Sequence, residues 1–170
     1  MLRSLILVLV AGALCAQSTF RPARFGGLVL GKAKERDFVA KFGKPKTRFE
    51  DRRGTLWIYY DDIAPAPGRV ELVGDVKTTT INAIDWSPSA MTLNEVKALF
   101  GKGYKEVKFS SDTCLNDGGD TPIFEDPNGD IAFLVYDQLG VALNINTYPL
   151  VVEYLSEPLG PKKSRCPQQK

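Results

Sequence analysis

Two stretches of this 170-residue chain contain the same tripeptide at the same point, and this repetition limits the folds that the chain can adopt. FVAKFGKP, at 38–45, and VKALFGKG, at 96–103, both contain Phe-Gly-Lys, and the two phenylalanines lie 58 positions apart. A glycine after an apolar helical stripe is a common helix end, because glycine adopts positive φ at low cost. The sequence therefore predicts two short helices that end alike.

The second helix has the clearer signals. Thr92 and Glu95 form a capping box, in which the threonine side chain and the glutamate satisfy the first free amides of the helix. Apolar residues then recur at helical spacing, and Gly101 follows where the helix should end. These signals predict an amphipathic helix near 93–100. The first helix shows a looser apolar stripe before Gly43.

Each predicted helix is followed by short runs rich in β-branched and aromatic residues, which are typical of strands. TRFE, TLWIYYD, RVELVGD and KTTTINAIDW follow the first helix, and YKEVKFS, DIAFLVYD, GVALNINTY and LVVEYLSE follow the second. An insertion at 111–129 leaves room for one further strand at PIFE. The gaps between these runs are too short for long helices, which favours antiparallel meanders over parallel crossovers.

We therefore predict an α+β fold of two tandem repeats, each a helix followed by a four-stranded antiparallel sheet. The helices are expected on one face of the sheet layer. The first repeat would span 17–87 and the second 88–158, and 159–170 would form a C-terminal tail. The alternative is a single, unrepeated α+β domain in which the shared tripeptide is a coincidence.

The segment GLVLGKAKERDFVAKFGKP, followed by the aromatic strand WIYY, resembles the SmpA/OmlA-type small outer-membrane assembly lipoproteins. In that family a helix ends in Leu-Gly-x-Pro before a strand with a w-x-Y pattern. Two such units in tandem resemble the β-lactamase-inhibitor-protein fold. The resemblance covers most of the mature chain through short patterns, and it departs at Gly103, where the second unit would carry proline. It implies a fold rather than an activity.

The N-terminus predicts a secretory signal peptide over 1–16. Arg3 precedes a short apolar run, and small residues surround a cleavage point after Cys15 or after Ala16. The run is shorter than the roughly 20 apolar residues that span a bilayer, so no transmembrane anchor is expected. Leu14 stands where a lipobox requires a small residue, so lipid anchoring at Cys15 is not expected. We expect a secreted or periplasmic protein.

Charge gives the mature chain no strong overall field. The sequence has 22 basic and 20 acidic residues, and loss of Arg3 with the signal leaves a net charge of +1. A nucleic-acid partner is therefore not expected. The basic stretch PKKSRCPQQK at the C-terminus is interpreted as a solvated tail.

Two cysteines remain after removal of the signal, and in an exported protein an even count favours a disulfide. Cys114 lies in a polar loop and Cys166 in the proline-rich tail. We predict a Cys114–Cys166 bond that fastens the tail to the loop. A thiolate metal site is a poor alternative, because the chain has no histidine and only these two thiols.

The absence of histidine also rules out a Ser-His-Asp or Cys-His catalytic arrangement. General acid–base chemistry would depend on carboxylates or lysine. Acidic residues cluster between 116 and 130, where two interpretations are open: a calcium site or a pair of turns with Pro-Asn-Gly closing a hairpin. The ligands of such a calcium site would be Asp117, Asp120, Asp126, Asn128 and Asp130. We predict no metal and no cofactor.

Aromatic residues give the best indication of a binding surface. One face of an antiparallel sheet can pack on helices while the other stays open. Trp and Tyr are enriched in binding hot spots, so those that share the open face are the candidates. The predicted partner-binding residues are Trp57, Tyr59, Trp86, Tyr136 and Tyr154. The alternative is that these rings pack between the two halves or against loops.

We therefore expect an exported, non-enzymatic binding or scaffold module that engages a protein or cell-envelope component through the aromatic sheet face. Two alternatives remain: a secreted carboxylate-dependent hydrolase that works without histidine, and a purely structural or ligand-carrying domain. A concave, aromatic sheet face would favour binding. A deep pocket with converging acids would favour the hydrolase.

Overall fold

The computed structural model describes residues 19–115 and 122–166. The predicted signal peptide at 1–16, Cys15 and the acidic residues Asp117 and Asp120 lie outside the described residues. The elements in chain order are β1 (Arg24–Phe25), β2 (Leu28–Val29), α1 (Glu35–Phe42), β3 (Thr47–Glu50), β4 (Thr55–Asp61), β5 (Gly68–Asp75), β6 (Ile81–Pro88), α2 (Leu93–Phe100), β7 (Lys105–Ser111), a 3₁₀ turn (Thr113–Leu115), β8 (Ile123–Glu125), β9 (Ile131–Tyr136), β10 (Val141–Asn144) and β11 (Val151–Leu155).

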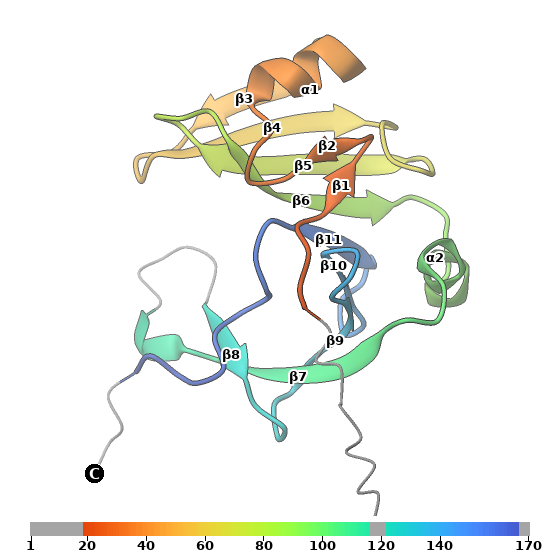
Figure 1. Ribbon diagram of the computed structural model, residues 1–170, viewed down its shortest axis with the longest axis vertical. Helices are drawn as coiled ribbons and strands as arrows, with labels where there is room; N and C mark the ends of the chain where they lie inside the picture. Colours follow the sequence, from red (N-terminus) through yellow and green to blue (C-terminus); the bar gives the residue numbers. More distant parts are fainter. Residues whose placement is uncertain (1–18, 116–121, 167–170) are drawn as a thin grey trace, which may run out of the picture.

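Strands β3 to β11 form one nine-stranded sheet with the order β3-β4-β5-β6-β11-β10-β9-β7-β8 (Figure 1). All its strand pairs are antiparallel, as predicted. All eight predicted runs form strands, and PIFE supplies the additional strand β8 at one edge. The short hairpin β1–β2 forms a separate two-stranded sheet.

The prediction of an α+β fold with two tandem helix-plus-sheet repeats is wrong. Strands take up 41% of the described residues and helices 13%, and strands β3 to β11 belong to one sheet rather than two. The two halves of the sheet are connected by the antiparallel pairing of β6 with β11, in which Trp86 lies opposite Val152 and Ile84 opposite Tyr154. Two separate sheets would each leave strand edges with free N–H and C=O groups, and this pairing satisfies them.

The two predicted helix ends are confirmed locally. Helix α2 covers the predicted range, and its capping box is present: the Thr92 N–H donates to Glu95 Oε2 at 2.8 Å. Gly43 and Gly101 end the two helices with φ of 83° and 79°. The Tyr60 hydroxyl donates a hydrogen bond to the carbonyl of Gly43 at 3.1 Å, and the Tyr136 hydroxyl donates one to the carbonyl of Gly101 at 3.3 Å. The shared tripeptide thus marks helix ends that are each capped by a core tyrosine.

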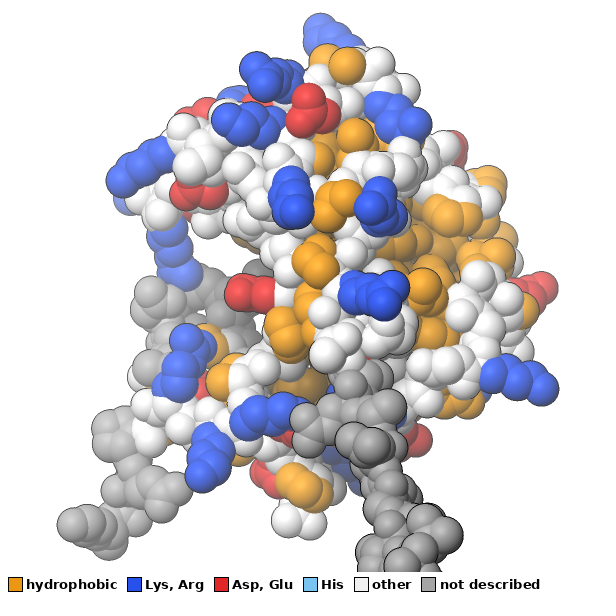
Figure 2. Space-filling view, viewed as in Figure 1, with side chains coloured by type: hydrophobic (Ala, Val, Ile, Leu, Met, Phe, Trp, Pro, Cys, Tyr) orange, Lys and Arg blue, Asp and Glu red, His pale blue; other side chains and the backbone are white. Residues whose placement is uncertain are grey.

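Both helices pack on one face of the sheet. Phe38 of α1 and Val96 of α2 are fully buried in the larger core cluster, together with the inward side chains of the central strands. Hydrophobic side chains of this helix side also reach the surface beside α2 (Figure 2). None of the described helices is long and apolar enough to cross a bilayer.

The opposite face of the sheet is covered only in part. A second core cluster lies there, over β7, β9, β10 and β11, and Phe20 and Leu159 pack against it. Its buried members are Phe109, Phe133, Val135, Ala142 and Leu155. The segments before β1 and after β11 therefore cover this face over β7, β9 and β10. The face over β4, β5 and β6 stays open beside the C-terminal segment.

Candidate functional site

A cleft of about 920 Å³ lies on the sheet face opposite the helices, and we call this surface the cleft face. Strand register defines which side chains share it, because directly paired residues point to the same side of a sheet. Trp57 pairs with Val73, and Val73 pairs with Ala83. All three line the cleft, and residues 157–161 after β11 form its wall.

A row of carboxylates crosses the floor of the cleft. Glu71 of β5 lies opposite Asp85 of β6, which lies opposite Glu153 of β11. Like charges directly opposite on neighbouring strands repel one another, so this row is a cost to the fold. Arg69 offsets part of it, since its Nη2 lies 2.7 Å from Glu71 Oε2. The hydrogen bond to Glu71 also raises the pKa of the Arg69 guanidinium.

The charge of the whole cleft is negative. Among the residues that the structure describes, the lining holds the three carboxylates of the row together with Glu157, and one cation, Arg165. Four negative groups and one positive group give the lining a net charge of −3. A cleft with one sign of charge concentrates ligands of the opposite sign.

Three aromatic rings flank the cleft near the β3 edge of the sheet. The Phe49 ring stacks on Trp57 with centroids 6.1 Å apart and on Tyr59 with centroids 5.9 Å apart. The guanidinium of Arg69 lies 4.8 Å from the Tyr59 ring centroid. Burial and the adjacent Glu71 carboxylate raise the pKa of Tyr59. Phe49 is 44% exposed, so this aromatic group remains accessible to a partner.

The predicted set of five aromatic residues is divided between the two faces. Trp57 and Tyr59 lie half-buried on the cleft face, and their role in binding stays a prediction. The assignment of Trp86, Tyr136 and Tyr154 to an open face is wrong, because these side chains are 0%, 1% and 4% exposed in the helix-side core. The alternative interpretation, that the rings pack inside, holds for these three.

Strand parity explains the division. In DIAFLVYD both alternating sets are apolar, so the sequence does not show which set faces the helices. Phe100 of α2 packs on Tyr136 with ring centroids 5.6 Å apart, which places the Tyr136 set on the helix side. The other set, with Phe133, lies under the C-terminal segment. Burial raises the pKa of the Tyr154 hydroxyl.

The sequence interpretation missed Phe49 and the carboxylate row. Phe49 occupies an alternating position in TRFE and could have been assigned to the face of Trp57 by register. Glu71, Asp85 and Glu153 each alternate with buried apolar residues, which places each on the outer face of its strand. Their proximity depends on β11 lying beside β6, and nothing in the local pattern indicates that neighbour.

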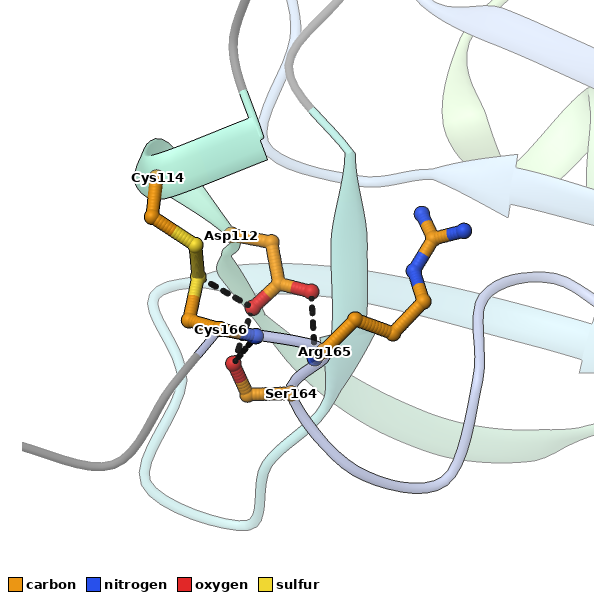
Figure 3. The surroundings of a disulfide bond; sticks show 5 residues. All are labelled: Asp112, Cys114, Ser164, Arg165 and Cys166. Atoms are coloured by element: carbon orange, nitrogen blue, oxygen red, sulfur yellow. Dashed lines mark hydrogen bonds between the residues drawn. A yellow bond between two sulfur atoms is a disulfide. The ribbon is translucent and has the colours of Figure 1, made fainter.

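The predicted disulfide between Cys114 and Cys166 is confirmed, with a Cα–Cα distance of 5.8 Å (Figure 3). It links the 3₁₀ turn after β7 to the C-terminal segment. The stretch 161–170 is the predicted solvated tail; its described part, 161–166, is exposed or half-buried but is held to the fold rather than free. Leu159 packs against the second core cluster, and the Glu125 N–H donates to the carbonyl of Pro161 at 2.9 Å.

Asp112 holds the same segment beside the disulfide. It is 1% exposed and accepts hydrogen bonds from the Ser164 hydroxyl and, at 2.9 Å, from the Arg165 N–H. Burial acts to raise the pKa of this carboxyl, yet the hydrogen bonds from Arg165 and Ser164 outweigh it and hold the pKa below its usual value. Figure 3 shows the Arg165 side chain extending away from the disulfide, and Arg165 lines the cleft.

Asp112 therefore predicts an acid-sensitive attachment of the C-terminal segment. Because its pKa is lower in the folded protein than in the unfolded chain, its stabilising effect is present at neutral pH and is lost as the pH falls through the folded value. We expect Asp112→Asn to lower the urea midpoint at pH 7. At pH 3 the difference from the unsubstituted protein should shrink. A difference that is independent of pH would contradict this role.

The calcium interpretation of the acidic segment receives no support from the described residues. Asp126 accepts the Ser110 hydroxyl at 2.7 Å and the Asn128 N–H at 2.9 Å, which makes it part of a turn. The turn does not close a hairpin, because β8 and β9 pair with opposite edges of β7. Among the residues that the structure describes, no group of three or more acidic or cysteine side chains is placed to hold a metal ion.

Comparison of the chain with protein-family models, curated proteins and solved structures finds no match. The resemblance to the SmpA/OmlA-type lipoproteins therefore stays a prediction from short sequence patterns.

Proposed function

We propose that this chain is an exported, non-enzymatic binding module that engages a protein partner through the cleft face. The observation that carries the proposal is the cleft of about 920 Å³, whose floor is a carboxylate row and whose edge is the stacked aromatic group of Phe49, Trp57 and Tyr59. Exposed aromatic rings supply large contact areas at low conformational cost. The cleft supplies the concave shape that seats a segment of another chain.

Export is part of the proposal and has two supports. The N-terminal sequence is typical of a signal peptide, which supports a secreted or periplasmic location. The Cys114–Cys166 disulfide supports an oxidising compartment, since reducing compartments keep most cysteines as thiols.

A second candidate function is favoured by the acids in the cleft. Asp85 and Glu153 are directly opposed on neighbouring strands, and paired carboxylates are the groups that histidine-free hydrolases use. The cleft is open along the sheet, however, and hydrolases of this kind depend on an enclosed site that raises one carboxyl pKa. Loss of glycoside or ester hydrolysis in both Asp85→Asn and Glu153→Gln would favour this candidate over binding.

Site-specific photo-crosslinking tests the binding function. Benzoyl-phenylalanine at Val73, which lines the cleft, is expected to give discrete protein adducts when the module is exported in its own cell. The same probe at Asn94, which is exposed on α2, is the control and should give none of these adducts. Identical adducts from both positions, or adducts from Asn94 alone, would contradict a partner on the cleft face.

A further inference from the structure

We infer that the occupant of the cleft is an extended, basic segment of the partner protein, with two cationic side chains at alternate positions. This inference rests on the proposed function, and it specifies the class of partner. It follows from three properties of the cleft face: its charge, its width across the strands, and the apolar surface beside the carboxylate row.

Charge selects a cationic ligand. The lining carries a net charge of −3, and the carboxylates of Glu71, Asp85 and Glu153 stand next to one another across three strands. The repulsion within such a row costs stability in the free protein. A bound guanidinium or ammonium group is attracted to the row, because a cleft lined by one sign of charge concentrates ligands of the opposite sign.

The width of the cleft sets the length of the segment. The open lining runs from Trp57 on β4 to Glu153 on β11, across the order β4-β5-β6-β11, because the second core cluster covers this face of β10 and β9. Three inter-strand steps of about 4.8 Å give a floor of about 14 Å, which an extended chain of roughly four residues crosses. Alternate side chains of that chain lie about 6.7 Å apart on one side, so two of them reach the carboxylate row together.

Apolar surface beside the row favours long cationic side chains over small cations. Val73 and Ala83 line the cleft beside the carboxylates. The aliphatic stems of arginine and lysine pack on such surface while their charged ends reach the acids. Trp57 adds an aromatic ring that a guanidinium can stack on.

Peptide binding tests the inference directly. The probes are nine-residue peptides of glycine and serine with a fluorescent label, carrying two arginines at alternate positions, two glutamates at those positions, or neither. Fluorescence anisotropy is expected to show saturable binding of the arginine peptide alone. That binding should weaken at least tenfold between about 50 mM and about 500 mM salt, because the added ions screen the charges.

A matched pair of variants locates the interaction. D85N/E153Q removes two charges from the cleft, and E106Q/D130N removes two from exposed positions that do not line it. We expect at least a tenfold loss of arginine-peptide affinity for D85N/E153Q and a change of less than twofold for E106Q/D130N. Urea unfolding of both variants checks that each is folded at the assay temperature.

Four results would overturn the inference. Equal binding of the glutamate or neutral peptide would exclude charge as the selecting property, and equal loss in the two double variants would place the site elsewhere. Sedimentation that shows a dimer dissociated by D85N/E153Q would assign the cleft to a second copy of this chain. If no peptide binds but crosslinks form at Val73, the basic-segment inference fails while the proposed binding function stands.

Discussion

Replacing Trp86 with alanine is expected to lower the free energy of unfolding by about 3–5 kcal/mol, the range for a large aromatic residue that loses its packing. Trp86 is 0% exposed and lies in the middle of the sheet, between Val70 on β5 and Val152 on β11. Its indole N–H has no hydrogen-bond partner among the described residues, so the substitution removes packing without removing a hydrogen bond.

Trp57→Ala is the matched control, since it truncates the other tryptophan of the chain. Trp57 is half-buried on the cleft face and donates to Asp51 at 3.2 Å, so a stability loss on the order of 1 kcal/mol is expected. Urea unfolding followed by circular dichroism gives both values. Equal losses would show that Trp57 belongs to the core, and a small loss for Trp86 would contradict its position in the sheet.

The secondary structure could be predicted from the sequence because its causes are local. The capping box at Thr92, the glycines after each apolar stripe and the β-branched runs all act within a few residues. The architecture could not, because the pairing of β6 with β11 joins residues about seventy positions apart through backbone groups that every sequence carries. Two sheets of four strands and one sheet of nine have nearly the same local patterns.

The candidate site was predicted in part for a similar reason. Alternation correctly separates Trp57 from Leu56 and Ile58, because β4 carries an apolar set on one side and a mixed set on the other. It fails for Tyr136, because both sides of β9 are buried, one under α2 and the other under the C-terminal segment. The carboxylate row and the cleft wall arise only when distant segments meet, so no single stretch of sequence contains them.

Removing the Cys114–Cys166 disulfide is expected to lower the free energy of unfolding by about 4 kcal/mol, on the chain-entropy model for a loop of this length. The bonded residues are 52 positions apart, and the bond restricts the unfolded chain over that whole distance. In the folded protein the C-terminal segment keeps other attachments, because Asp112 still accepts the Arg165 N–H and Leu159 still packs on the second core cluster.

The double variant Cys114→Ser/Cys166→Ser is the appropriate test, because a single substitution leaves a free thiol that can form bonds between molecules. Urea unfolding should show the loss as a lower midpoint, and the unsubstituted protein in reducing agent should match the variant. Reducing agent should leave the variant itself unchanged. Since the retained contacts hold the cleft wall in the folded state, Val73 crosslinking should persist in the variant at temperatures where it is folded. Loss of crosslinking in the folded variant would show instead that the disulfide itself positions residues 157–161 as the wall of the binding site.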